Sequence, residues 1–345
     1  MDELEKVDTL YTKICSLINE AKKNVKTAVN IAMVYTYYNI GKMIIEDEQK
    51  GNYRAEYGAK VIEGLSNKLT KEFGKGFSKD NIKLMRRFYM VYSHDQIGET
   101  VFTQFNFPTN SNVERQFFLS WSHYLVLMRI DNIDERHFYE IECVKNNWSL
   151  REFERQLNSS LFERLLLSTD KSKVKELSIK GQIIEKPEDA IKDPYVLEFL
   201  GLPELPSYSE AELETKIIDN LEDFLLELGK GFTFVARQQR FTFEEEHFKV
   251  DLVFYNRILR CFVLFDLKID KLTHQDLGQM QMYVNYYDRF VSLPEENKTI
   301  GILLCKDKKD TVVKLTLPED NTQIFASKYQ EVLPSKEELK KLLEN

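Results

Sequence analysis

The chain has few cysteines and no long apolar run. Its four cysteines are far apart and none forms a CxxC pair, so the sequence indicates neither a zinc ribbon nor a disulfide framework. No stretch approaches the length of a membrane span, and residues 1–20 mix acidic, basic and apolar side chains where a secretory leader has a continuous apolar segment. We therefore expect reduced thiols, no membrane association and a cytoplasmic location.

Signatures of several enzyme classes are missing too. The five histidines form no HExxH or other metal spacing, and the chain has no Walker A sequence, GxGxxG fingerprint or serine nucleophile elbow. The net charge of −8 lacks the basic excess that a general phosphate binder usually carries. Any phosphate contact must therefore come from local basic faces or from bound cations.

The composition predicts a folded chain with two domains. Hydrophobic residues make up 43% and charged residues 30% of the 345 positions, which is typical of a globular protein too long for one core. Residues 169–208 become Lys-rich and are then punctuated by prolines. We predict a helical domain at 1–170, a junction at 171–208 and a second domain at 209–345.

The first part of the chain has the apolar spacing of helices. Gly74 and Gly76 separate two of them, Ser78 and Ser120 are N-cap candidates, and Ser149 with Glu152 forms a capping box. Residues 97–112 read as an exposed connection. The predicted helices span 4–45, 54–73, 78–92, 120–129, 134–145 and 149–167, with Asp134 as the cap of the fifth.

After residue 209 the apolar period changes. An amphipathic helix at 210–228 is followed by strand candidates at 232–243, 248–255 and 259–268, a helix at 275–289 and a short strand at 299–305. The order α-β-β-β-α-β describes an α/β layer domain. Together with the all-helical first part, this gives a two-domain protein of mixed α+β and α/β class.

Charged residues interrupt two of these strands. Cys261 to Leu267 is apolar except for Asp266, and Lys268 projects from the same face of the strand. In the preceding strand, residues 248, 250, 252 and 254 predict one apolar face, which leaves Asp251 on the other. A hairpin turn centred near residues 258 and 259 would bring Asp251 and Asp266 opposite each other.

Two adjacent carboxylates repel unless a cation or a proton lies between them. An oxygen-only, thiol-free pair suits Mg²⁺ or Mn²⁺, with Asp251 and Asp266 as the metal ligands. Lys268 would then hold an attacking water or phosphoryl oxygens. The alternative is a surface hairpin with an unrelated Asp251, because D-x-K is a short motif.

The surrounding order of elements resembles the PD-(D/E)XK phosphodiesterase superfamily, and longer segments resemble its YhcG family. These segments lie in both halves of the chain, so the resemblance covers nearly its whole length. They are YRAEYG at 53–58, FGKGFS at 73–78, MRRFY at 85–89, LSWSH at 119–123, ELE at 212–214, FLLELGKGF at 224–232, VDLVFY at 250–255, FDLK at 265–268 and GQMQMY at 278–283.

The resemblance implies a restriction-endonuclease-like core and a metal-dependent DNA nuclease whose catalytic core is Asp251, Asp266 and Lys268. Two positions depart from the family pattern. Asp266 stands where the pattern has Glu, which shortens the reach of the carboxylate and puts full activity and metal affinity in doubt. Val250 replaces the proline of the motif's name.

Further candidates surround this core. Glu214 is the additional acid that many superfamily members carry on the first helix, with Glu222 as its alternative; either residue is equally compatible with a solvated carboxylate. Gln279 and Tyr283 lie one helical turn apart and would support the site, although Tyr283 also suits plain packing. Arg237, Gln238 and Gln239 on the first strand are candidates for contacts to the DNA backbone.

Basic residues recur on two helices of the first domain. The turn before residue 78 has helix-turn-helix spacing, which predicts phosphate contacts, while a helical bundle with solvated charges is the alternative. The DNA-binding candidates are Lys79, Lys83, Arg86, Arg87, Arg151 and Arg155.

The sequence therefore predicts an Mg²⁺- or Mn²⁺-dependent endonuclease that acts on DNA. The alternative is a non-catalytic DNA-binding or interaction protein on a nuclease-like scaffold, which the acidic balance and Asp266 favour. Branched DNA and foreign DNA are both open as substrates. A homodimer would supply the two active sites that cleavage of both strands commonly needs.

Overall fold

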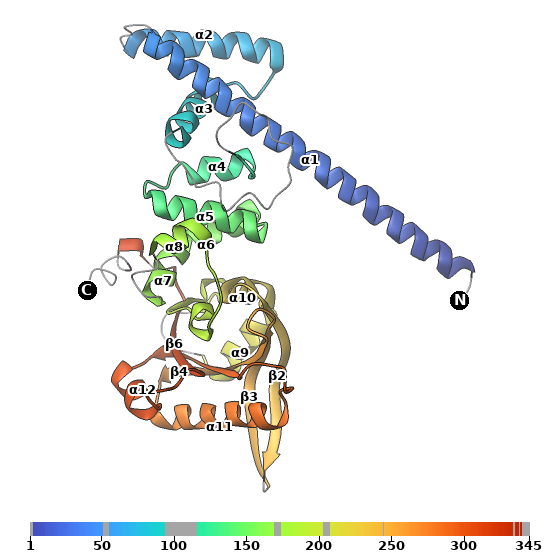
Figure 1. Cartoon of the computed structure of the whole chain (residues 1–345), viewed down its shortest axis with the longest axis vertical. Coiled ribbons are helices and arrows are strands. Elements are labelled where there is room, and N and C mark those ends of the chain that lie inside the picture. Colours follow the sequence, from blue (N-terminus) through green and yellow to red (C-terminus); the bar gives the residue numbers. More distant parts are fainter. Residues whose placement is uncertain are drawn as a thin grey trace. The chain divides into compact units, whose positions relative to one another are not determined.

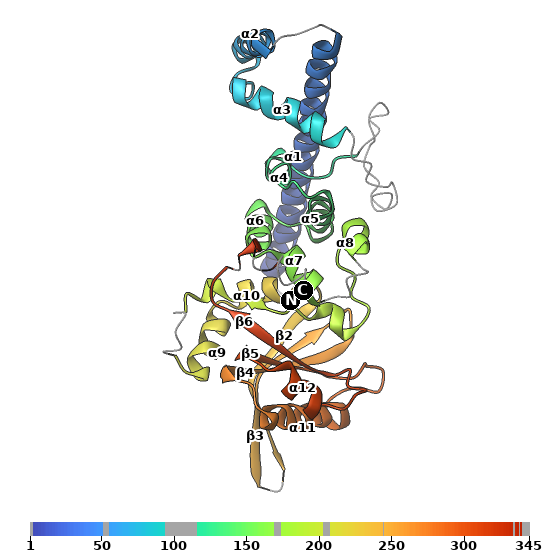
Figure 2. The same cartoon turned by 90° about the vertical axis from the view of Figure 1, so that its left-hand side faces the viewer.

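The computed structural model describes residues 3–50, 55–93, 116–168, 174–202, 208–243, 245–333, 335–337 and 339. They divide into two compact units (Figures 1 and 2). The helical unit comprises Met1–Glu154 and Ser178–Gly181, and the sheet unit comprises Arg155–Leu177 and Gln182–Asn345. The connection predicted at 97–112 lies outside the described residues. The N-terminal helical region and the C-terminal mixed sheet confirm the predicted fold class.

Helices build the first unit, because apolar residues recur at intervals of three and four. Ile44, Ile62 and Ile82 form a small core between the first three helices. Ser78 caps the third helix by accepting a hydrogen bond from Asn81 N at 3.2 Å, as predicted. The helices are α1 (Glu3–Lys50), α2 (Ala55–Phe73), α3 (Lys79–Tyr92), α4 (Trp121–Leu127) and α5 (Ile133–Asn146), and Asn132, not Asp134, caps the last.

Helices α1 and α3 approach each other closely at Gly41. A Cβ atom built on Gly41 would lie 2.1 Å from Met85 O on α3. No real Cβ tolerates that distance from a backbone atom, so the contact between the two helices requires glycine here. Gly64 on α2 differs, because its Cβ would meet nothing within 4 Å.

We expect Gly41→Ala to lower the free energy of unfolding of the helical unit by about 1–3 kcal/mol through overpacking. Gly64→Ala is the matched control and should raise it by about 0.5–1 kcal/mol, because alanine restricts the unfolded helix segment more than glycine does. Both tryptophans, Trp121 and Trp148, lie in the helical unit. Denaturant unfolding followed by tryptophan fluorescence therefore reports on this unit, and equal shifts in the two variants would contradict the role of Gly41.

Two predicted helices are each divided by a break. The capping box of Ser149 and Glu152 opens α6 (Leu150–Asn158) as predicted. The helix ends before Ser160, whose φ of 52° is left-handed, and α7 (Leu161–Ser168) follows. The helix predicted at 210–228 is divided at Asn220 into α9 (Glu210–Asp219) and α10 (Leu221–Leu228).

A six-stranded mixed sheet forms the centre of the sheet unit. Its strand order is β1-β6-β5-β4-β3-β2, with antiparallel pairing among β2, β3 and β4 and parallel pairing from β4 to β1. The mixed sheet therefore changes its hydrogen-bonding pattern at β4. The strands are β1 (Tyr195–Val196), β2 (Phe232–Phe243), β3 (Glu246–Asn256), β4 (Cys261–Lys271), β5 (Ile300–Asp307) and β6 (Ile324–Gln330).

Helices cover both faces of this sheet. Leu213, Ile217 and Phe224 of α9 and α10 pack on one face, and Leu277 and Met280 of α11 (His274–Phe290) pack on the other. The short helix α12 (Asp310–Thr316) lies between β5 and β6 in the chain. The predicted α-β-β-β-α-β core is thus present, with β1, α12 and β6 added to it.

The segment 171–208, predicted as a junction, contains regular structure. It includes α8 (Val174–Lys180), two 3₁₀ turns (Pro187–Ala190 and Glu198–Leu200) and β1, which pairs with β6. The described part of this segment therefore contributes the edge strand of the sheet. None of the helices in the described ranges has both the length and the apolarity needed to cross a bilayer.

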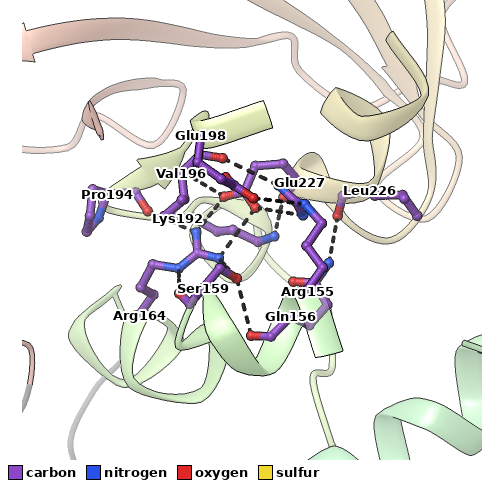
Figure 3. A network of polar contacts seen from close by, with 10 residues as sticks. All are labelled: Arg155, Gln156, Ser159, Arg164, Lys192, Pro194, Val196, Glu198, Leu226 and Glu227. Atoms are coloured by element: carbon purple, nitrogen blue, oxygen red, sulfur yellow. Dashed lines mark hydrogen bonds and ion pairs between the residues drawn. The ribbon is translucent and has the colours of Figure 1, made fainter. Parts of the chain in front are cut away.

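A buried ionic network joins α6, α7, β1 and α10 within the sheet unit (Figure 3). Glu227 is fully buried and lies 2.5 Å from Arg164, whose side chain is also fully buried. Arg155 lies 3.5 Å from Glu227, and Lys192 donates to its backbone oxygen. Val196 N of β1 donates to the Glu227 carboxylate at 3.0 Å. The network thus fixes the first strand of the sheet to the helices beside it.

Candidate active site

The hairpin of β3 and β4 brings the two predicted carboxylates together. Leu252 pairs with Phe265 and Asn256 with Cys261, so the turn is centred between residues 258 and 259 as predicted. Asp251 and Asp266 are the next residues along the two strands, just beyond the last paired positions. The Asp251 Oδ2 atom accepts a hydrogen bond from Leu267 N at 2.8 Å, which ties the first carboxylate to the other strand.

Burial and mutual repulsion perturb both carboxylates. The pKa of Asp251 is raised to about 7, first by burial and then by the charge of Asp266. The pKa of Asp266 is raised by burial, and Lys268 opposes that rise. At neutral pH the pair therefore holds a proton readily, which a cation bound between the carboxylates would replace.

Lys268 lies beside Asp266 on the same strand. Its Nζ atom is 2.9 Å from Asp266 Oδ2 and 3.9 Å from Glu210 Oε2 at the start of α9. Burial alone would lower the pKa of Lys268, but Asp266, Glu210 and Asp251 raise it above its ordinary value. Because its pKa is raised, Lys268 stays charged at neutral pH. Because its side chain is 18% exposed, it also remains accessible to a ligand.

The side chains of β3 do not alternate regularly between the two faces of the sheet at the site. Leu252 belongs to the core under α9 and α10, whereas Phe248 and Val250 pack in the core under α11. The prediction that Phe248, Val250 and Leu252 share one face is therefore wrong. At the same position along the sheet, Gln238 on the neighbouring β2 has a left-handed φ of 53°, and no pairing joins it to Asp251.

Glu214 lies close to the two carboxylates but has partners of its own. It is 2% exposed and accepts hydrogen bonds from Arg237 Nε at 3.0 Å and from the amide of Gln238. Its charge contributes to the raised pKa of Asp251, which places it within electrostatic reach. Glu222, the alternative acid, is exposed on α10. The structure thus brings Glu214 and Gln238 to the site.

Helix α11 brings Gln279 and Tyr283 to the other side of the carboxylates. The Gln279 amide donates to the Tyr283 hydroxyl, and Tyr283 is 1% exposed. Burial raises the pKa of Tyr283, and Asp266 and Asp251 raise it further. The phenol therefore stays protonated beside the carboxylates and can donate a hydrogen bond.

The donor set suits a small divalent cation that keeps much of its water. Within the described ranges, no group of three or more His, Cys, Asp or Glu side chains is arranged to hold a metal ion. A closed protein cage is therefore not present there. One or two carboxylates with water and phosphate oxygens are the usual ligands of Mg²⁺, and Asp251 and Asp266 fit that arrangement.

Four predicted DNA contacts lie on α3, and two of them have close partners within the helical unit. Arg86 makes a bidentate ion pair with Glu48, with distances of 2.7–2.9 Å. Arg87 donates to Met128 O at 2.8 Å. Lys79 and Lys83 are exposed, and their ion pairs with Glu63 and Asp80 are both 3.9 Å long. The lysines thus remain available to a phosphate, whereas the arginines also hold helices together.

The two remaining candidates are not equivalent, although both lie on α6. Arg151 is exposed. Arg155 is only 14% exposed in its side chain and makes ion pairs with Glu198 and Glu227. The exposed basic face predicted for Arg151 and Arg155 is therefore corrected, because partners distant in the sequence bury Arg155.

Two further residues near the carboxylates were not predicted. Glu210 lies near Lys268, and the charge of Asp276 on α11 helps to raise the pKa of Asp266. Both are in the first turn of a helix that a capping box opens. That capping signal is visible in the sequence, but it does not show which strand each helix start approaches.

Comparisons with known proteins match both halves of the chain. Residues 188–344 match the model of the YhcG PDDEXK nuclease domain, and residues 13–164 match the DUF1016 N-terminal domain. The chain is 38% identical over 345 residues to "Putative nuclease YhcG" of Escherichia coli (strain K12). That alignment covers 96% of this chain and 92% of the relative.

Two solved nuclease structures show slight likeness. A repair endonuclease from Pyrococcus abyssi is 20% identical with a TM-score of 0.26, over 39% of this chain and 50% of that one. A complex of EndoMS with double-stranded DNA is 19% identical with a TM-score of 0.27, over 37% and 46%. The chain spans about half the length of these two proteins.

Proposed function

Because the chain belongs to the YhcG family of PD-(D/E)XK nucleases, we propose that it is a divalent-metal-dependent endonuclease that hydrolyses phosphodiester bonds of DNA. The observation that supports this proposal most is the buried carboxylate pair with Lys268 beside it. Burial of two carboxylates side by side, which raises the pKa of both, is a cost that a purely structural hairpin has no need to bear.

Asp251 and Asp266 would hold the cation, Mg²⁺ or Mn²⁺. When bound, the ion would polarise the phosphoryl group and lower the pKa of a water molecule. The hydrogen bond from Leu267 N to Oδ2 fixes the orientation of the Asp251 carboxylate. Because Asp266 is one methylene shorter than Glu, its reach depends on the close approach of β3 and β4.

Lys268 would act on the reacting group. Water loses a proton to solvent as it adds to phosphorus, the bond from phosphorus to the leaving oxygen breaks, and that oxygen takes up a proton from solvent. Negative charge accumulates on the phosphoryl oxygens in the transition state. A charged ammonium held by Asp266 and close to Glu210 is positioned to stabilise that charge. Tyr283, protonated and supported by Gln279, can donate to a ligand of the same site.

Glu214 would act as a positioning residue. Its carboxylate is held by Arg237 and Gln238, so it orients β2 next to Asp251. Arg237 is 44% exposed in its side chain and offers its remaining donors to a DNA phosphate. The exposed Lys79, Lys83 and Arg151 are the candidates for further phosphate contacts in the helical unit.

The test is cleavage of a panel of supercoiled, linear, single-stranded and four-way DNA with Mg²⁺ or Mn²⁺. Asp251→Asn should abolish cleavage, while Asp270→Asn, an exposed position of β4, should not. Since protons compete with the cation for Asp251, whose pKa is about 7, the cation concentration for half-maximal cleavage should rise as pH falls below 7. The expected rise is about tenfold per pH unit.

Failure to cut any of these substrates, by folded protein with either cation, would overturn the enzyme proposal. Retained DNA or partner binding in that case, unchanged in Asp251→Asn, would favour a non-catalytic scaffold. The panel also ranks branched against unbranched substrates, which tests one of the two substrate classes that the sequence leaves open.

A further inference from the structure

An apolar stripe on α1 is uncovered by the described residues. Between residues 11 and 30, no residue with a described side chain is buried. The large apolar residues of this stretch are exposed to 46–67% of their surface: Tyr11, Ile14, Leu17, Ile18, Val25 and Val29. Long helices are stabilised mainly by packing of an apolar face, so an uncovered stripe of this length indicates a missing partner.

The stripe has the spacing of a coiled coil. Its core positions alternate strictly at intervals of three and four and form a heptad repeat with apolar a and d positions: Tyr11, Ile14, Ile18, Ala21, Val25, Ala28 and Ala32. Leu17 and Val29 flank this seam. The other residues from 12 to 30 are polar except Cys15, so the apolar surface is confined to one stripe.

The stripe is separate from the face that α1 uses within its own chain. From Ile31 onward α1 packs on the helical unit through Val34, Tyr38 and Gly41. Val34 is 20 positions after Ile14, which at about 100° per residue places it on roughly the opposite side of the helix. A partner on the stripe would therefore leave the intrachain packing undisturbed.

We propose that this stripe is the surface on which a second copy of the chain docks, as an antiparallel coiled coil centred near residue 16. In that register Ile14 lies opposite Ile18 of the second copy, and Tyr11 lies opposite Ala21. Tyr11, the largest side chain of the seam, thus meets a small one, while two isoleucines of equal size meet at the centre. This inference is independent of the nuclease chemistry, since it rests on α1 alone.

The distribution of charge favours the antiparallel direction. Residues 2–8 include four acidic side chains and one basic one, whereas residues 22–26 include three lysines and no acid. An antiparallel pair centred near residue 16 sets residues 3–8 of one copy against residues 24–29 of the other, so Glu5 and Asp8 lie within about one helical turn of the lysines at both ends of the pair. A parallel pair would instead set acid against acid and lysine against lysine, which costs stability and specificity.

The first test measures the mass of the full chain in solution at micromolar concentration by light scattering. Wild type should have twice the mass of one chain. Ile14→Asp with Ile18→Asp buries charges in the seam and should weaken self-association about a hundredfold or more. Ser16→Asp with Asn19→Asp adds the same charge on the polar side of α1 and should leave the dimer intact.

The second test uses Cys15, which flanks the seam beside the centre of the register. Because Cys143, Cys261 and Cys305 are buried, a short bis-maleimide should join two chains through Cys15, and Cys15→Ser should abolish the product. A monomeric wild type, or a dimer that persists in Ile14→Asp with Ile18→Asp, would overturn the proposal. A seam-dependent dimer without the Cys15 cross-link would overturn its antiparallel direction.

Discussion

DNA cleavage should fall by about a hundredfold to a thousandfold when Lys268 is replaced by methionine, because removal of a preorganised donor to a developing oxyanion costs that much. Methionine keeps an unbranched side chain and removes the charge together with its hydrogen-bond donors. Lys268 lies 2.9 Å from Asp266, in a hairpin whose strands are held by backbone pairing. The fold should therefore survive the substitution, and the loss should appear in kcat rather than in DNA affinity.

The matched control is Lys271→Met, which removes the same charge from an exposed position of β4. Single-turnover cleavage at saturating cation separates chemistry from binding, and a DNA-binding measurement shows that the complex still forms. Cleavage by Lys268→Met at the wild-type rate would remove Lys268 from the reaction. Equal losses in both variants would instead indicate a general effect of charge on DNA binding.

The second large effect concerns stability rather than chemistry. Replacing Glu227 with glutamine should lower the free energy of unfolding of the sheet unit by about 3–5 kcal/mol, since it leaves buried cations without their counter-charge. Arg164 is fully buried and donates to the Glu227 carboxylate, and the charge of buried Lys192, which donates to the Glu227 backbone oxygen, also interacts with that carboxylate (Figure 3). Glu222→Gln, on the exposed side of the same helix, should change stability by less than about 0.5 kcal/mol.

Both tryptophans lie in the helical unit, so their fluorescence does not report on the sheet unit. The change in stability of the sheet unit is therefore measured by hydrogen exchange of the β5 amides. Burial alone would raise the pKa of Glu227, but the charges of Arg164, Lys192 and Arg155, together with the hydrogen bond from Arg164, outweigh burial and lower this pKa to about 2. A carboxyl group with a lowered folded pKa contributes stability above its unfolded pKa of about 4.5 and loses it as pH falls toward 2. Wild type should therefore lose stability across that range, and Glu227→Gln should lose less. Parallel pH curves for the two proteins would contradict this assignment.

The sequence predicts those features that depend on neighbouring residues. The hairpin register of β3 and β4 follows from strand length and the position of the turn, so the approach of Asp251 to Asp266 was visible before the structure. Capping by Ser78 and Ser149 was visible for the same reason. Each of these features involves residues that are close in the chain, where spacing and propensity carry most of the information.

The features that escaped prediction depend on distant partners. The local sequence predicts an exposed helix residue at Arg155, whereas the structure places Glu227, which is distant in the sequence, beside it. Strand β1 is only two residues long and pairs with β6 near the other end of the sequence. The change of face at Asp251 coincides with the left-handed Gln238 on the neighbouring strand β2. No local pattern contains such information.

The hairpin turn of four residues between β3 and β4 limits how this chain can vary in length. Because successive strand residues point to opposite faces, inserting or deleting one residue between Asn256 and Cys261 would turn one carboxylate away from the other. The tip that joins β2 and β3 carries the same restriction, because Arg237 and Gln238 of β2 bind Glu214 beside Asp251. Insertions of a single residue should therefore be rare among relatives at both turns of this three-stranded meander.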